Sequence, residues 1–135
     1  MQRTALRRVA VTALALAALG GGALATAGSA SALQRDGHVE AGELGLYYSP
    51  DRGGAVFDLG NSDEDFSDDQ FLGTGAGAGQ SVDDNTASYW NNDTYTWLVY
   101  TGTYRQGLAA SLPPGYIGNA TATFRHQISS AYLGN

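Results

Sequence analysis

From residue 44 onward, short runs of aliphatic, aromatic and β-branched residues alternate with clusters of turn-forming residues. The apolar runs occupy residues 44–48, 55–59, 96–100, 108–112 and 120–124. Glycine, proline, asparagine and aspartate separate them roughly every ten residues, which is typical of strands joined by tight turns. No segment after residue 32 shows a convincing apolar repeat of 3.6 residues. The pattern therefore predicts an all-β sandwich.

The first 32 residues follow a different pattern, that of a secretory signal peptide. Three positive charges come first, on Arg3, Arg7 and Arg8. An apolar run over 9–27 follows, and the small residues of 30–32 form a cleavage motif, so we expect cleavage after Ala32 and secretion. A membrane anchor is the less favoured alternative, because glycines at 20–22 interrupt a run that would need about 20 strongly apolar residues.

These boundaries predict a signal peptide over 1–32, a flexible leader over 33–42 and one domain over 43–135. Beyond residue 32 the chain keeps four arginines and no lysine against thirteen acidic residues, a net charge of −9. Such a surface repels nucleic acid and anionic lipid, so both are excluded as partners. The chain has no cysteine, so a secreted domain of this size must be stabilised by packing or by a bound cation.

The domain also contains an internal repeat. Tyr47 precedes Gly54 by seven residues, and Tyr100 precedes Gly107 by the same number. Each half ends in a serine-containing turn before a tyrosine, with Ser129 in the second half. The spacing predicts a strand that folds back in a tight hairpin under an aromatic ring, with the glycine where a side chain would clash or where φ is positive. Two similar halves would form one two-sheet domain.

These motifs resemble the βγ-crystallin superfamily, whose Greek-key unit has an aromatic-x6-Gly hairpin and a later serine turn. Within it, residues 79–92 look like the junction between halves in the peptidase inhibitor I36 family of small secreted actinomycete proteins. The resemblance implies two Greek keys, over about 43–92 and 96–133, in a monomer that inhibits an extracellular protease of the thermolysin-like metalloprotease class. The family's characterised type has disulfides near its reactive segment, which this chain lacks. Killer-toxin-like secreted proteins of the same superfamily are an alternative.

Catalysis is not expected. His38 and His126 lack the surroundings of a Ser/His/Asp triad or of a metalloprotease motif, so no catalytic residue is predicted. Nothing in the inhibitor hypothesis requires a cofactor.

Calcium is the alternative cofactor, in a calcium-binding structural or interaction module. The resemblance places the ligands of the superfamily's calcium loop at four residues, Asp84, Asn85, Thr86 (through its carbonyl) and Ser88. Oxygen donors of these types suit Ca²⁺. In the second half, Arg125 and His126 stand in place of the expected acidic or amide residues, so at most one weakened site is expected. The other interpretation is that Asp84 and Asn85 simply form an Asx-turn.

Two segments are candidates for an inhibitory loop. The first half carries about twelve more residues than the second, within an insert over 61–79 that holds Phe71 and Leu72. These would suit a protease that prefers a bulky apolar residue after the scissile bond, but the glycines predict a floppy, solvated loop. The other candidate is the junction loop, which the resemblance favours because the family's inhibitory loop lies near the start of the second half. Its residues are Asn92, Asp93, Thr94, Tyr95, Thr96 and Trp97. Trp90 and Trp97 are both expected to pack between the sheets.

Overall fold

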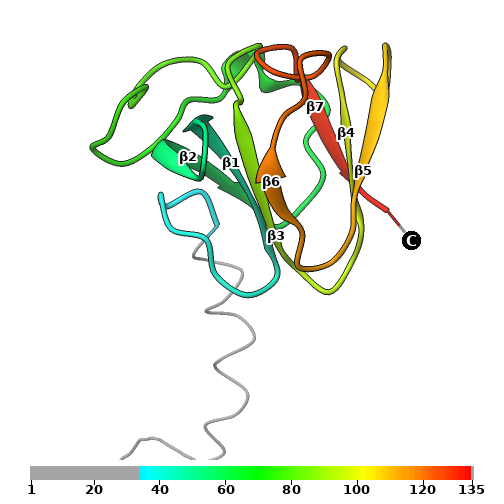
Figure 1. Ribbon diagram of the computed structural model, residues 1–135, viewed down its shortest axis with the longest axis horizontal. Coiled ribbons are helices and arrows are strands. Elements are labelled where there is room, and N and C mark those ends of the chain that lie inside the picture. Colours follow the sequence, from blue (N-terminus) through cyan, green and yellow to red (C-terminus); the bar gives the residue numbers. More distant parts are fainter. Residues whose placement is uncertain (1–33, 135) are drawn as a thin grey trace, which may run out of the picture. The chain divides into compact units, whose positions relative to one another are not determined.

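A computed structural model describes residues 34–134 of the chain (Figure 1). The predicted signal peptide and its cleavage site lie outside the described residues. Within 34–134, no helix is long and apolar enough to cross a membrane. The described part contains one 3₁₀ turn, η1 (Phe66–Asp68), and seven strands: β1 (Glu43–Ser49), β2 (Gly53–Leu59), β3 (Ser88–Asn92), β4 (Trp97–Tyr100), β5 (Ala109–Leu112), β6 (Ile117–Asn119) and β7 (Ser130–Leu133). The prediction of an all-β fold is confirmed.

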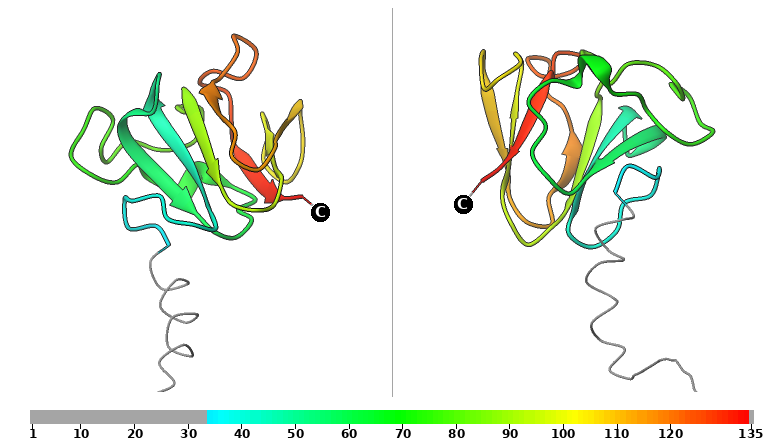
Figure 2. Two further views of the ribbon diagram at one scale, coloured as in Figure 1. Left: turned by 60° about the horizontal axis from the view of Figure 1, so that its bottom comes forward. Right: turned by 180° about the vertical axis from the view of Figure 1, so that it is seen from behind.

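The strands form two antiparallel sheets, in the orders β2-β1-β3-β6 and β5-β4-β7 (Figures 1 and 2). β6 belongs to the second half of the chain but pairs with β3 of the first half. In return, Asp63 of the first half lies against β7, where its N–H donates to the Ala131 carbonyl (2.8 Å) and its carbonyl accepts the Ala131 N–H (2.9 Å). Each half therefore contributes one extended segment to the sheet of the other, which is the exchange expected of two paired Greek keys.

The core lies between the sheets and is built from alternate residues of the strands. Its largest fully buried members include Trp97, Phe57, Leu44, Leu46, Leu59 and Val99. The predicted packing of Trp97 between the sheets is confirmed. Trp90 is different: it is half-buried on the outer face of β3, with the Arg52 guanidinium carbon 5.2 Å from its ring centroid. Tyr89 and Asn91 take the inward positions of β3, so strand parity directs Trp90 outward.

The repeated hairpins have the expected glycine geometry. Gly54 has φ +74° and Gly107 has φ +81°. A Cβ on Gly54 would lie 2.8 Å from the Ala76 carbonyl oxygen. The Ser88 hydroxyl donates to the Ser49 carbonyl (2.7 Å), which ties the later turn to the first hairpin.

In the second half, the residue equivalent to Ser88 is Ser130, because its hydroxyl donates to the Gly102 carbonyl at the same position of the hairpin (2.7 Å). The repeat in the sequence had suggested Ser129. That residue instead donates its backbone N–H to the Tyr100 carbonyl (2.9 Å) and its hydroxyl to Asp84 Oδ1 (3.3 Å). The two serines are adjacent in sequence, so only the hydrogen bonds distinguish their roles.

Residues 34–42, here termed the N-terminal strap, were expected to form a flexible leader. They are instead docked onto the first sheet, so the compact unit begins at Gln34. The Arg35 N–H donates to the Asp58 carbonyl (3.1 Å), and the Gly42 N–H donates to the Asn92 carbonyl (2.8 Å). The Arg35 guanidinium also pairs with Asp63 (2.8 Å) and Asp69 (2.9 Å). The partners of the strap lie 20 or more positions further along the chain, so the local sequence of the strap does not predict that it is docked.

The insert over 61–79 is also packed rather than floppy. Phe66 and Phe71 are buried, and Leu72 exchanges backbone hydrogen bonds with Val56 at 2.9 and 3.1 Å. The insert therefore extends the first sheet beyond β2. Its glycines allow close approach: a Cβ on Gly77 would collide with the ring of Tyr48, which packs edge-on against Phe71 at 5.6 Å between centroids.

We expect Gly77→Ala to destabilise the domain by about 2 kcal/mol more than Gly79→Ala. The two glycines have φ +85° and +84°, so alanine is strained equally at both. A Cβ on Gly79 meets nothing within 4 Å, whereas one on Gly77 meets the Tyr48 ring. Thermal or urea unfolding of the pair therefore isolates the packing contribution. Equal loss of stability in the two variants would show that the insert does not pack on Tyr48.

Candidate functional sites

The junction loop over 92–97 connects the two halves between β3 and β4. It lies at the same end of the molecule as the β5–β6 connection (Figure 1). Thr94 and Tyr95 form its tip, and the side chain of Tyr95 is 59% exposed. Asn92, Asp93 and Thr96 are half-buried, and Trp97 is in the core. The part of this candidate that a partner could contact is therefore its tip, and Trp97 is not available for binding.

Asn91, a fully buried residue of β3, holds the loop in place. Its Nδ2 lies 2.9 Å from the Tyr95 carbonyl oxygen, 2.8 Å from that of Leu112 and 3.0 Å from that of Pro113. Its Oδ1 accepts the Asp93 N–H (2.9 Å). Because an amide has only two N–H bonds, the three carbonyls share them. One side chain thus fixes both the junction loop and the start of the β5–β6 connection.

Asp93 closes the junction loop from the other side. Its Oδ2 accepts the indole N–H of Trp97 (3.0 Å), and its Oδ1 accepts the backbone N–H of Thr94 (2.7 Å). The loop is therefore anchored to a core tryptophan as well as to Asn91. Sequence reasoning included Asp93 as a loop residue but did not single out Asn91. The signal available was strand parity, which puts this asparagine at an inward position of β3.

The β5–β6 connection over 113–116, here termed the proline loop, lies beside the junction loop. Backbone bonds join it to Asn91 in both directions: the Asn91 N–H donates to the Tyr116 carbonyl and the Gly115 N–H donates to the Asn91 carbonyl, both at 2.8 Å. Tyr116, the last residue of this loop, and Ile117, the first residue of β6, are exposed. The junction loop and the proline loop together form one braced, partly aromatic face, here termed the two-loop surface.

The insert does not present the residues that sequence reasoning proposed. The Phe71 side chain is 1% exposed and packs against Tyr48, and Leu72 is half-buried and hydrogen-bonded to Val56. The expectation that a protease could contact Phe71 is therefore wrong for this structure. The apolar pair contributes to folding by covering the edge of the first sheet.

The turn over 84–88 pairs with the corresponding turn of the second half. The Asp84 N–H donates to the Ile128 carbonyl (3.1 Å), and the His126 N–H donates to the Thr86 carbonyl (3.0 Å). Asp84 and His126 also share a left-handed backbone, with φ +60° and +59°. In the second half, the residue equivalent to Asp84 is thus His126, and the residue equivalent to Asn85 is Gln127. The sequence had suggested Arg125 and His126 for these two positions.

Several of the predicted calcium ligands make hydrogen bonds within the protein. The Ser88 hydroxyl is buried, donates to Ser49 and accepts the Arg52 N–H (2.9 Å). The Asn85 amide donates to the Ser81 carbonyl (2.8 Å). Burial, together with neighbouring Asp83, raises the pKa of Asp84 above its ordinary value. These contacts favour a structural turn at 84–88, and calcium binding there stays a prediction.

Asp69 is a largely buried carboxyl, with its side chain 10% exposed, and its protonation should affect stability. Burial, a hydrogen bond to Asp63 and the charge of Asp63 raise its pKa to about 7, against the opposing effect of Arg35. The folded chain therefore holds a proton that the unfolded chain releases near pH 4. The stabilisation that this proton contributes is fully present below the unfolded pKa of the carboxyl and is lost as the pH rises through 7.

We expect the free energy of unfolding to fall between pH 5 and pH 7 by roughly 1 kcal/mol per pH unit through Asp69. Asp69→Asn cannot titrate, so its profile should be flatter over this range. The exposed Glu64→Gln variant removes the same charge at the surface and serves as the control. Urea unfolding at several pH values measures the slopes. Equal slopes in wild type and Asp69→Asn would exclude this effect.

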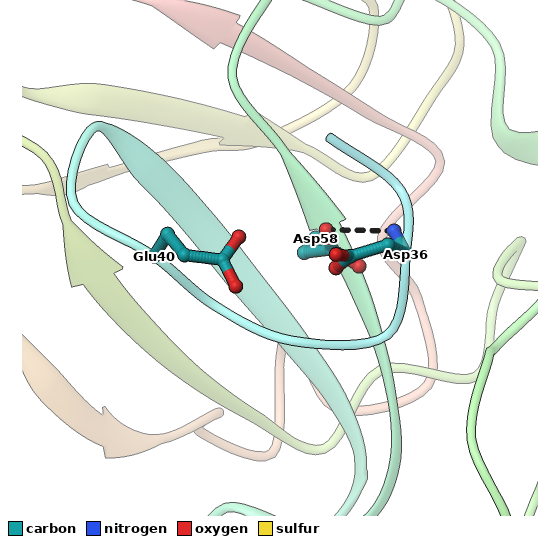
Figure 3. Close-up of side chains that lie close together, drawn as sticks. All are labelled: Asp36, Glu40 and Asp58. Carbon is teal, nitrogen blue, oxygen red and sulfur yellow. Dashed lines mark hydrogen bonds between the residues drawn. The ribbon is translucent and has the colours of Figure 1, made fainter. Parts of the chain in front are cut away.

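A cluster of acidic residues lies beneath the N-terminal strap. One side-chain oxygen each of Asp36, Glu40 and Asp58 lies within 4.8 Å of the others (Figure 3). Asp58 is fully buried on β2 and accepts the backbone N–H groups of Asp36 (3.0 Å) and Gly37 (2.8 Å). Glu43 adjoins the cluster, and burial with hydrogen bonds to Glu40 and Asp58 raises its pKa to about 9. Sequence reasoning did not find this cluster, because it treated part of it as a flexible leader.

Solved structures share this architecture. One, from work on the evolution of the eye lens βγ-crystallin domain fold, is 17% identical with a TM-score of 0.59, covering 73% of this chain and 91% of that chain. A βγ-crystallin from Ciona intestinalis is 20% identical with a TM-score of 0.52 (69% and 100% covered), and an archaeal one is 20% identical with a TM-score of 0.53 (70% and 100%). At these identities the likeness shows the fold alone. No curated protein matches the sequence significantly.

The two sheets with exchanged strands thus define a βγ-crystallin-type domain, as predicted. Residues 36–112 match peptidase inhibitor family I36, and the chain belongs to that family. The match includes the N-terminal strap from Asp36 onward, the insert and the junction loop. This is a family of inhibitors and not of enzymes, and membership implies a protease as partner.

Proposed function

We propose that this protein is secreted and inhibits an extracellular metalloprotease by inserting the tip of the junction loop into the protease cleft. The observation that carries the proposal is the bracing of an exposed tip by the buried Asn91, within the region that matches the inhibitor family. Tyr95 offers the largest exposed side chain on this tip. The metalloprotease class and the secretion rest on the resemblance and on the signal peptide described above.

Rigidity is what separates an inhibitor from a substrate. A loop already fixed in its bound conformation loses little entropy in the cleft, and its ends stay in place if the bond between them is cut. In this chain, Asn91 and Asp93 fasten the loop to the proline loop and to Trp97 without any covalent link. This network supports the idea that hydrogen bonds replace the disulfides that the family's characterised type has near its reactive segment.

The proline loop extends the contact area that a protease could cover. A standard protease–inhibitor interface buries about 1,600 Å² in total, which requires more than one short loop. Tyr116 and Ile117 are exposed next to the junction loop and supply neighbouring apolar surface. The two-loop surface therefore provides a tip that enters the cleft and an apolar surface that contacts the protease beside the cleft.

Titration against a thermolysin-like metalloprotease tests the proposal. Residual protease activity should fall linearly with added protein and reach a minimum near a one-to-one ratio. A serine protease of similar activity provides the parallel arm and should retain its activity. Rapid cleavage of the protein with no loss of metalloprotease activity would refute inhibition, whereas inhibition of the serine protease alone would refute the assigned class.

A further inference from the structure

Four carboxyl groups from three segments meet under the N-terminal strap. Asp36 and Glu40 belong to the strap, Glu43 begins β1, and Asp58 lies on β2. Figure 3 shows the Glu40 side chain pointing across the space towards Asp36 and Asp58. The strap arginine does not neutralise the group, since the Arg35 guanidinium is bonded to Asp63 and Asp69. The exposed His38 imidazole stands at the rim, with Nδ1 3.8 Å from Asp36 Oδ1.

A buried carboxyl lies beside this space, next to Glu40 and Asp58. Glu43 is only 3% exposed and its carboxyl hydrogen-bonds with Glu40 and Asp58, while its Oε1 accepts no hydrogen bond from an N–H or O–H group within residues 34–134. Glu40 Oε1 is likewise buried and accepts no hydrogen bond from the part of the chain that the structure describes. An unsatisfied buried polar atom is costly, and neighbouring carboxylates also repel one another. A cation that displaces the proton held by Glu43 would satisfy these oxygens and remove the repulsion.

We propose that Asp36, Glu40, Glu43 and Asp58 form a binding site for one calcium ion. Calcium takes oxygen ligands at about 2.3–2.6 Å, so ligands on opposite sides of the ion are roughly 4.6–5.2 Å apart. The oxygens of Asp36, Glu40 and Asp58 lie within 4.8 Å of one another, which allows one such ion to contact all three. Glu43, which adjoins Glu40 and Asp58, would supply a further ligand from the buried side once it releases its proton. Asp36 is exposed, so water can complete the coordination from solvent.

Calcium fits this arrangement better than magnesium. Magnesium requires a near-ideal octahedron at about 2.0–2.1 Å, and so a tighter group of ligands. Here Asp58 is held by two backbone N–H bonds from the strap, which limits its adjustment. The site is also separate from the turn over 84–88, where the resemblance had placed calcium.

Binding at this site would fasten the strap to the first sheet next to the junction loop. Glu43 is the register partner of Asn92, and the Gly42 N–H donates to the Asn92 carbonyl at 2.8 Å. Asn92 is the first residue of the junction loop. An ion bound to Glu43 and Asp58 would thus brace the base of that loop, whether or not the loop inhibits a protease.

Thermal unfolding and calorimetric titration of chelator-treated protein test the proposal. At constant ionic strength, CaCl₂ should raise the Tm by at least about 5 °C with saturation, and calorimetry should give one site per chain. MgCl₂ and additional KCl are the controls for general screening of the acidic surface. The absence of saturable binding at millimolar Ca²⁺ would overturn the proposal, and so would an equal shift with KCl.

Variants then locate the site. Glu43→Gln and Glu40→Gln preserve size and should lose the calcium-dependent shift, and the half-buried Glu40 serves if the buried Glu43 variant fails to fold. The matched variant Glu64→Gln removes an exposed charge and should keep the shift. Asp84→Asn should also keep it. A shift retained in Glu40→Gln and Glu43→Gln, or abolished in Asp84→Asn, would overturn the assignment to the strap.

Discussion

Replacing Asn91 by alanine should abolish protease inhibition and lower the free energy of unfolding by about 3 kcal/mol or more. The substitution leaves the carbonyls of Tyr95, Leu112 and Pro113 without their side-chain donor, and two of them belong to segments that form the two-loop surface. The bond to Leu112 is buried, and a buried acceptor left unsatisfied costs about 1–3 kcal/mol. The two partly buried bonds to Tyr95 and Pro113 add smaller losses. The released junction loop should then be cleaved by the protease rather than block it.

Urea unfolding and protease titration of the same samples measure the two effects. Asn91→Asp retains the volume of the side chain but replaces the donors by an oxygen, so it should be at least as damaging as alanine. If the alanine variant lost stability only because of the cavity it creates, the aspartate variant would keep the stability of the wild type. Asn92→Ala, one residue along on the outer side of β3, provides the control for stability. Full inhibition by Asn91→Ala would contradict the proposed role of the network.

Replacing Tyr95 by alanine should weaken inhibition by about 30-fold or more while leaving stability nearly unchanged. The expected size is that of an interface hot spot, where removal of a tyrosine commonly costs at least about 2 kcal/mol. The side chain is 59% exposed, so the fold loses little packing.

Tyr104→Ala is the matched control for this effect. Tyr104 is 55% exposed and lies in the β4–β5 hairpin, at the opposite end of the molecule from the junction loop (Figure 1). Inhibition constants and Tm values should be measured for both variants. Unchanged inhibition by Tyr95→Ala would remove the tip of the junction loop from the interface, and a loss confined to Tyr104→Ala would move the interface to the other end.

The Asn91 and Tyr95 variants distinguish two causes of lost inhibition, namely loss of loop rigidity and loss of a contact with the protease. Asn91 contacts no partner in the proposed complex, so its replacement acts by loosening the loop and should lower both stability and inhibition. Tyr95 makes no side-chain hydrogen bond within residues 34–134 as described, so its replacement should act on the partner contact alone. Loss of both properties in the Tyr95 variant would mean that this side chain supports the fold instead.

Some features of the fold followed from patterns that are local in sequence. The alternation of short apolar runs with turns was sufficient for an all-β prediction, and the repeated hairpin spacing of Tyr47 and Gly54 indicated two similar halves. Strand parity could have predicted that Trp90 faces outward, because its neighbours in β3, Tyr89 and Asn91, face inward and alternate residues of a strand face opposite sides of the sheet. Exact equivalence between the halves could not be obtained this way, since Ser129 and Ser130 are adjacent and only their hydrogen bonds distinguish them.

The fold class, the two-part organisation and the resemblance to an inhibitor family could be predicted from the sequence, because each rests on short motifs along the chain. The folded chain was needed to show that the strap is docked, that Phe71 is buried and that Asn91 braces two loops. The same holds for the acidic cluster, where Asp36 and Asp58 are 22 positions apart. The physical reason is that antiparallel pairing, both within the first half and between the halves, brings distant segments together. Burial then changes the chemistry of each polar side chain that it encloses.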